Sequence, residues 1–153
     1  MGDYLKLNYN FELDFIARNT LKGEIDCVQP DFITHQYPWL QKQYIYENIR
    51  LAGFIDIAAM KLNAISGNGT RLKDFIDIAM MSYKISLNQM LIAYEQKYKS
   101  NPIMPLKGLL FYDDINFNEP IKMIGNNSFN WKAIEKRLKL MQKFPDKIFE
   151  IPI

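Results

Sequence analysis

The spacing of apolar residues changes along the chain from a strand-like period to a helix-like one. Before about residue 50, apolar and polar positions alternate, most clearly over Phe11–Arg18, which is the pattern of a half-buried strand. From Gly53 onward, apolar residues recur every three or four positions, which indicates amphipathic helices. The pattern predicts an α+β fold in a single domain, with residues 1–50 mostly β and residues 51–153 mostly α.

Turn and capping residues set the bounds of these elements. We expect a short helical piece at Met1–Tyr9 and a tight turn at Asp26-Cys27. After the first strand, the predicted strands are Gly23–Val28, Asp31–His35 and Gln43–Arg50. Gly53, Thr70, Ser86 and Asn130 stand at expected helix N-caps, and Ser86 with Gln89 forms a capping box. The predicted helices are Gly53–Ser66, Arg71–Lys84, Ser86–Tyr98, Pro105–Tyr112 and Trp131–Phe144.

Composition narrows the class of protein without indicating an activity. The chain has 153 residues, of which 48% are hydrophobic, enough for one core. A net charge of +2 does not by itself indicate nucleic acid or membrane, and no apolar run has the roughly 18 residues of a membrane span. One cysteine, Cys27, and one histidine, His35, exclude an internal disulfide and a His/Cys zinc site. We expect a cytoplasmic protein with no membrane partner.

The charged residues whose spacing points to chemistry lie in one run, DIAAMKLNAISGNGTRLKDFID, at Asp56–Asp77. At about 100° per residue, Lys61 falls in the middle of the apolar stripe of the first helix. That stripe consists of Phe54, Ile57, Ala58 and Ile65. A lysine on a core face either extends outward or meets an anion there, so we expect Lys61 to be largely buried.

The next helix supplies the candidate anions. Asp74 and Asp77 are three residues apart, so both carboxylates can address one point on a face separate from the apolar stripe. That stripe consists of Leu72, Phe75, Ile76, Ala79 and Tyr83. A Gly-rich turn between the helices would bring Lys61 near Lys73, Asp74 and Asp77. Two interpretations stay open: an interhelical salt-bridge network that fixes the hairpin, or a site in which Lys61 binds a triphosphate and one aspartate assists catalysis.

The same run resembles the helical signature of the AbiEii/AbiGii-type nucleotidyltransferases, the toxin half of bacterial abortive-infection toxin–antitoxin pairs. That signature has a lysine, an alanine three residues later, a Gly-flanked arginine, and a basic residue followed by Asp-x-x-Asp. The matching residues are Lys61, Ala64, Lys73, Asp74 and Asp77, whereas Asn68 stands where the family usually has arginine. The resemblance extends through PLKGLLFYDDINFNEPIKMI and, upstream, NTLKGEID and DFITHQYPWL.

The resemblance implies a polymerase-β-like fold, here a remnant sheet of three to four strands followed by four to five helices. Such enzymes transfer a nucleoside monophosphate from a triphosphate, in some members to the acceptor end of tRNA, with Mg²⁺ held by carboxylates. Asp31 matches the third of these carboxylates and is the implied metal ligand. The implied catalytic residues are Asp31, Asp74 and Asp77, and the implied nucleotide-binding residues are Lys61 and Lys73. An antitoxin protein and tRNA are the implied partners.

The first two metal-binding carboxylates of the family have no counterpart here. They belong to an Asp-x-Asp strand after a Gly-Gly or Gly-Ser turn, and the spacing of Glu12 and Asp14 imitates them in what matches the following strand. Near Asp31, Cys27 replaces the usual hairpin glycine, and Pro30 suits an edge strand. We therefore expect an N-terminally incomplete relative that is inactive alone and binds Mg²⁺-triphosphate weakly or not at all.

Three further expectations remain. One alternative is an active nucleotidyltransferase using Glu12, Asp14 and Asp31. Another is a non-catalytic module that binds RNA or protein, for which the last helix offers basic residues: Lys132, Lys136, Arg137, Lys139, Lys143 and Lys147. Because a missing strand would expose a sheet edge, we also expect self-association into a dimer or higher oligomer.

Overall fold

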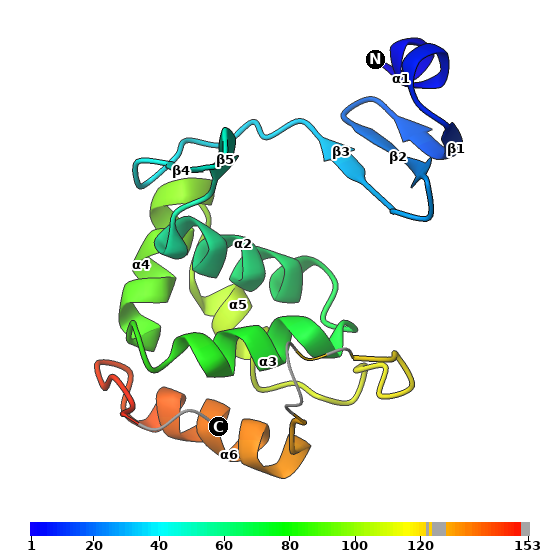
Figure 1. Cartoon of the computed structure of the whole chain (residues 1–153). Coiled ribbons are helices and arrows are strands. Elements are labelled where there is room, and N and C mark those ends of the chain that lie inside the picture. The colour runs from blue at the N-terminus through cyan, green and yellow to red at the C-terminus, as the bar shows by residue number, and fades with distance from the viewer. Residues whose placement is uncertain (122, 124–127, 151–153) are drawn as a thin grey trace. The chain divides into compact units, whose positions relative to one another are not determined.

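The computed structural model describes residues 1–121, 123 and 128–150, and these residues form an α+β structure (Figure 1). The predicted fold class is confirmed at this level. Where the sequence predicted one domain, the backbone contacts group the chain into two compact units, Met1–Tyr37 and Pro38–Ile153. The boundary lies between Tyr37 and Pro38, ahead of the predicted change from β to α near residue 50.

The first unit is a three-stranded antiparallel sheet with one short helix. Helix α1 (Gly2–Asn8) precedes strands β1 (Phe11–Ala17), β2 (Thr20–Ile25) and β3 (Asp31–Ile33). The strand order is β1-β2-β3, so β2 is central. Its small core is formed by buried and partly buried residues from the helix and all three strands: Leu5, Phe11, Leu21, Ile25 and Phe32.

The pairing of β1 with β2 contains an irregularity, and most of β1 is exposed. Leu13 pairs with Gly23 and Phe15 pairs with Lys22, so Asp14 is an extra residue in a β-bulge. A Cβ atom on Gly23 would lie 2.2 Å from the Glu12 carbonyl oxygen, so this position requires glycine. The predicted apolar face of β1 is wrong beyond its first member, because Phe11 is its one buried residue.

The turn after β2 has the predicted geometry. Asp26 and Cys27 both adopt positive φ, at 49° and 66°, as a two-residue hairpin turn requires. Strand β2 ends before this turn and therefore lies earlier than predicted. Strand β3 is an edge strand directly after Pro30, as the missing N–H of proline favours.

The second unit begins with a separate two-stranded hairpin. Strands β4 (Tyr44–Tyr46) and β5 (Ile49–Leu51) pair antiparallel, and all six residues are exposed. The single predicted strand Gln43–Arg50 is therefore wrong. Glu47 and Asn48 adopt positive φ, at 46° and 66°, and reverse the chain. Asparagine tolerates this conformation but glutamate rarely does, so the pair lacks the usual Asn-Gly or Asp-Gly turn signal.

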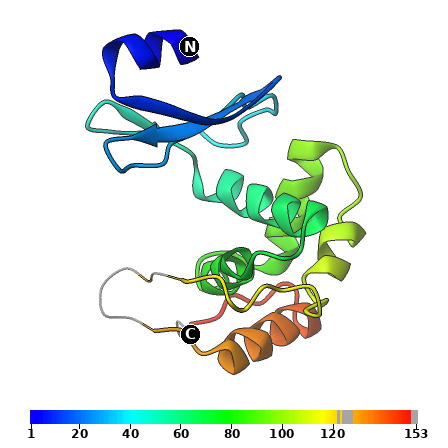
Figure 2. The same ribbon diagram turned by 90° about the vertical axis from the view of Figure 1, so that its right-hand side faces the viewer.

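Five helices complete the second unit and enclose the main core. They are α2 (Phe54–Gly67), α3 (Leu72–Met81), α4 (Leu87–Tyr98), α5 (Ile103–Gly108) and α6 (Trp131–Lys143). Helix α2 packs against α3, α4 and α5, and α3 lies between α2 and α6 (Figures 1 and 2). The largest core side chains include Leu62, Phe75, Met90, Leu109, Leu138 and Met141.

The predicted N-caps are confirmed except at α3, but two helices have other bounds than predicted. Helix α5 is Ile103–Gly108 instead of Pro105–Tyr112, and α3 ends at Met81 instead of Lys84. Gly53 is the N-cap of α2, Ser86 and Gln89 form the capping box of α4, and the Asn130 side chain accepts a hydrogen bond from Lys132 N. Thr70 was the wrong choice for α3, whose N-cap is Arg71 without a side-chain cap bond. Within the described residues, no helix has the length and apolar character needed to cross a membrane.

Candidate functional site

The hairpin of α2 and α3 brings one lysine between two carboxylates. Lys61 Nζ lies 2.8 Å from Asp74 Oδ1 and 2.6 Å from Asp77 Oδ2. The predicted ion pairs are therefore confirmed. The Lys61 side chain is 26% exposed, so most of it is buried, as predicted, and the rest stays open to solvent.

The two aspartates differ in their burial. Asp74 is 2% exposed and Asp77 is 46% exposed. The prediction that both aspartates share a face outside the core is wrong for Asp74. Helix α3 packs against α2 on one side and α6 on the other, so a larger part of the surface of α3 is buried. Asp74 Oδ2 accepts no hydrogen bond from the described residues, and Arg71 Nε lies 3.9 Å from it.

The surroundings of Lys61 set its charge state. Partial burial lowers the pKa of Lys61, but the hydrogen bonds to Asp74 and Asp77 and their negative charges outweigh that effect and raise it above 10.5. The ammonium is therefore charged at neutral pH. A cation held by two carboxylates is well compensated before any ligand arrives.

A shallow hollow of about 300 Å³ lies beside Lys61. Its lining combines the Lys61–Asp77 ion pair with apolar and aromatic side chains, namely Phe54, Ile57, Met80, Met81 and Tyr83. The predicted apolar stripe of α2 was partly wrong, because Ile57 is 37% exposed and belongs to this hollow. The residues that α2 buries in the core are Ala58, Ala59, Leu62 and Ile65.

Lys73 does not join the cluster. Its ammonium lies 3.4 Å from Glu119 Oε1, in the segment after α5. The expectation that the hairpin would bring Lys73 next to Lys61 is wrong, because consecutive residues of a helix point about 100° apart. A direct part for Lys73 in a ligand site at Lys61 therefore has no support in the geometry.

Asp31 and the Glu12–Asp14 pair belong to the first unit. Asp31 opens β3 opposite Lys22, and its Oδ2 lies 2.9 Å from Lys22 Nζ in a half-exposed ion pair. Glu12 is exposed on β1, and Asp14 is exposed at the bulge. In the described part of the chain, no group of three or more His, Cys, Asp or Glu side chains could hold a metal ion. The carboxylates of Asp31, Glu12 and Asp14 therefore do not fit a Mg²⁺ site.

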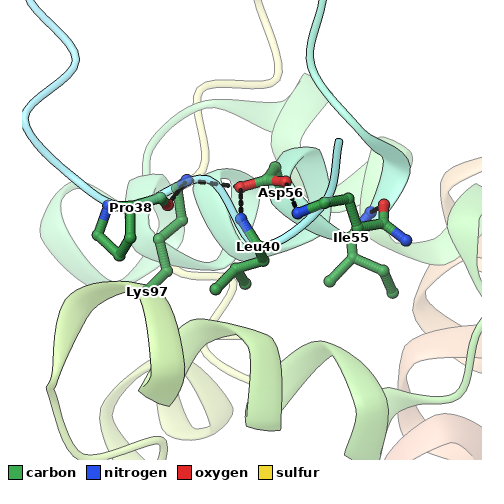
Figure 3. A network of polar contacts seen from close by, with 6 residues as sticks. Pro38, Leu40, Ile55, Asp56 and Lys97 are labelled. Carbon is green, nitrogen blue, oxygen red and sulfur yellow. Dashed lines mark hydrogen bonds and ion pairs between the residues drawn. The ribbon is translucent and has the colours of Figure 1, made fainter. Parts of the chain in front are cut away.

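A second lysine–aspartate pair, which the sequence analysis missed, lies wholly inside the second unit (Figure 3). Lys97 Nζ lies 2.7 Å from Asp56 Oδ1, and both side chains are 0% exposed. Asp56 also accepts hydrogen bonds of 3.0 Å from the backbone N–H groups of Leu40 and Gln41. Lys97 donates to the Pro38 carbonyl oxygen at 2.8 Å.

This pair holds the segment before β4 against two helices. Lys97 Nζ also lies 4.8 Å from the centre of the Trp39 ring, a cation–π contact. Burial raises the pKa of Asp56, but hydrogen bonds from Lys97, Leu40 and Gln41 and the charge of Lys97 lower it below 3.8 overall. Asp56 is therefore an ionised carboxylate, satisfied by the protein itself.

The sequence did contain a signal for Lys97. Helix α4 buries Met90, Ala93, Tyr94 and Lys97, so Lys97 follows the apolar residues at helical spacing. A lysine in an apolar stripe needs an anion if it stays buried, and this holds for Lys97 as it does for Lys61. Asp56 lies in the first turn of α2, where the helix dipole also favours an acid.

The basic residues in and after α6 do not form one exposed basic face. Arg137 is half-buried, donates to Ser82 Oγ at 2.9 Å and stacks over Phe149, and burial lowers its pKa. Lys139 pairs with Glu135 on the same helix. The remaining lysines of the predicted basic face are exposed, so that face is smaller than its sequence suggests.

No protein-family model, no curated protein and no solved structure matches this chain.

Proposed function

We propose that this chain is a nucleotidyltransferase-like protein of the AbiEii type that transfers no nucleotide by itself. Its Lys61–Asp74–Asp77 cluster would be the helical part of a nucleotide site in a cytoplasmic protein with a polymerase-β-like ancestry. An antitoxin protein and tRNA would be its macromolecular partners.

The observation that carries this proposal is the position of Lys61. Three of the residues that the resemblance assigns to the site, Lys61, Asp74 and Asp77, meet in space, whereas Lys73 pairs with Glu119. The Lys61 side chain is partly exposed and lines an open hollow, and a lysine in such a place suits a phosphate group as a compact point charge. The apolar and aromatic lining of the hollow suits the flat face of a base.

Charge explains why we expect triphosphate binding to be weak. Two carboxylates already hold Lys61, so a phosphate must displace at least one of them or share the cation with both. Asp77 is the partner that can yield, because it is 46% exposed and loses little when water replaces its contact. With no fitting Mg²⁺ donors among the described residues, we derive no transfer step through the metal.

A transfer assay tests the inactivity of the chain alone. Incubation with total tRNA, Mg²⁺ and each labelled nucleoside triphosphate should leave the RNA unlabelled. Label on RNA that disappears in an Asp14→Ala variant would contradict the proposal and establish the alternative of an enzyme using Glu12, Asp14 and Asp31.

Triphosphate binding tests the assignment of the cluster. The weak retention of labelled ATP that we expect should be lost in Lys61→Met, which keeps the aliphatic stem and removes the charge. Lys136→Met, at an exposed position of α6, makes the same change in net charge and should bind ATP like the original chain. Equal losses in both variants would show a diffuse charge effect instead of a site at Lys61.

A further inference from the structure

The β4–β5 hairpin exposes many large apolar side chains, although it has only two strands. Its five large apolar side chains, Tyr44, Ile45, Tyr46, Ile49 and Leu51, are 46–75% exposed. Isolated two-stranded hairpins are marginally stable in water, and three or more strands are usually needed. Clustered exposed apolar residues of this kind mark interaction surfaces.

The register of the hairpin determines which backbone groups are available at its edges. Tyr46 and Ile49 flank the two-residue turn and form the first hydrogen-bonded pair, so the next pair, Ile45 and Arg50, is non-hydrogen-bonded. The N–H and C=O of Ile45 therefore point away from β5, and those of Arg50 point away from β4. Among the described residues, no backbone hydrogen bond from outside the hairpin reaches either residue.

The β4 and β5 edges differ in which side chains would lie opposite each other if the edge paired with a second copy of the same strand. The β4 sequence, Tyr-Ile-Tyr, is uncharged and reads the same in both directions. An antiparallel copy centred on Ile45 would set Ile45 opposite Ile45, and Tyr44 opposite Tyr46 of the second copy. The β5 sequence, Ile-Arg-Leu, would set Arg50 against Arg50, and like charges directly opposite each other are destabilising.

We propose that the β4 edge pairs with β4 of a second copy of this chain, antiparallel about Ile45, to form a two-fold symmetric dimer. The strand order of the joined sheet is β5-β4-β4-β5. A two-fold interface requires a self-complementary surface, which the palindromic, uncharged β4 provides. This inference does not depend on the proposed nucleotide site and is tested separately.

The joined sheet also gathers the exposed side chains into one face. Tyr44 is opposite Leu51 and Tyr46 is opposite Ile49 in the hairpin, so these four residues share a face, and the second copy adds the same four. Two aromatic cross-strand pairs form at the centre, between Tyr44 of each copy and Tyr46 of the other. The joined sheet has four strands, whereas the β4–β5 sheet of one chain has two.

The edges of the three-stranded sheet are poorer templates, although that sheet was the one expected to pair. Strand β1 carries the Asp14 bulge and the charged Glu12 at its edge. Strand β3 begins with the charged Asp31 directly after Pro30. Bulges, charges and proline are the features that block edge-to-edge pairing, and β4 has none of them.

Sedimentation velocity on the full chain with matched proline variants tests the edge. Because neither outward N–H serves the hairpin itself, Ile45→Pro and Arg50→Pro should both leave β4 and β5 paired. The original chain and Arg50→Pro should dimerise as concentration rises through the micromolar range, whereas Ile45→Pro should weaken dimerisation about tenfold or more. Circular dichroism confirms that the helices of each variant are intact.

Opposite charges at the centre provide a test that does not depend on proline. Ile45→Lys and Ile45→Glu should each be monomeric, because each sets like charges together, and an equimolar mixture of the two should recover a heterodimer. A monomeric original chain at all concentrations would overturn the proposal. So would Ile45→Lys dimerising like the original, or Arg50→Pro being the variant that dissociates.

Discussion

Helix α2 carries two lysine–carboxylate contacts that differ in how completely the protein satisfies them. At one, Asp56 and Lys97 are both 0% exposed, and their remaining hydrogen bonds go to backbone groups of the segment before β4. At the other, Lys61 and Asp77 stay partly open to solvent and border a hollow, and Asp74 is buried.

The comparison separates a structural pair from a candidate site. The Asp56–Lys97 contact leaves no room for a ligand, because every strong interaction of the two charges is made within the chain. The Lys61 cluster has an exposed carboxylate that a ligand anion can replace, and a hollow that a ligand can fill. If this distinction is correct, substitutions at the two places should differ in their cost to stability.

The largest loss is expected for Asp56→Ala. Removing the carboxylate leaves the Lys97 ammonium buried without its counter-ion and also frees two backbone N–H groups. Breaking a buried ion pair on one side costs about 3–5 kcal/mol, so the urea midpoint should fall steeply. An unchanged free energy of unfolding would mean that Lys97 finds another anion or reaches water.

A smaller loss is expected for Asp74→Ala. This change removes a buried charged hydrogen bond to Lys61 but leaves Asp77 to pair with the ammonium. Hydrogen bonds to charged groups contribute about 1.5–3 kcal/mol. Urea denaturation beside Asp56→Ala checks the order, and a loss as large as that of Asp56→Ala would assign the Lys61 cluster a mainly structural role.

Asp77→Ala should cost about 0–1 kcal/mol, as for other exposed ion pairs. The cost would be about 3–5 kcal/mol if Asp77 were the main partner of a buried cation. Asp74 now takes that part, being 2% exposed and 2.8 Å from Lys61 Nζ. Thermal denaturation measures the difference, and a large drop in Tm would show that Asp77 is needed for folding.

The smallest effect is a dependence of stability on alkaline pH. The pKa of Lys61 is raised above 10.5 in the folded chain, so its stabilising contribution is fully present below 10.5 and is lost as pH rises through the higher folded value. Between neutral pH and pH above 10.5, the original chain should therefore lose more stability than Lys61→Met. Urea denaturation across that range checks this, and parallel curves would contradict it.

Local signals in the sequence predicted much of the second unit. The capping box at Ser86, the cap at Asn130 and the meeting of Lys61 with Asp74 all follow from residues close together on one helix or hairpin. Such contacts have a fixed helical spacing, so periodicity is enough to find them.

Contacts between distant parts of the chain were not predicted. Asp56 and Lys97 are 41 residues apart, and nothing in their spacing links them. The hairpin turn at Glu47-Asn48 lacks the Asn-Gly or Asp-Gly pair that usually marks such turns, and glutamate rarely adopts positive φ. Beyond Phe11, every residue of β1 is exposed, on both sides of the bulge at Asp14, so the alternation of apolar and polar residues did not predict which of them are buried.

The central claim is that Lys61 belongs to a nucleotide site in which the ion pair with Asp77 weakens ATP binding. Isothermal titration of ATP into Asp77→Asn tests it most directly, beside Glu135→Gln, which removes one negative charge from the Lys139–Glu135 pair on α6. We predict tighter ATP binding in Asp77→Asn and no change in Glu135→Gln. Unchanged binding in Asp77→Asn, or an equal gain in both variants, would contradict the claim.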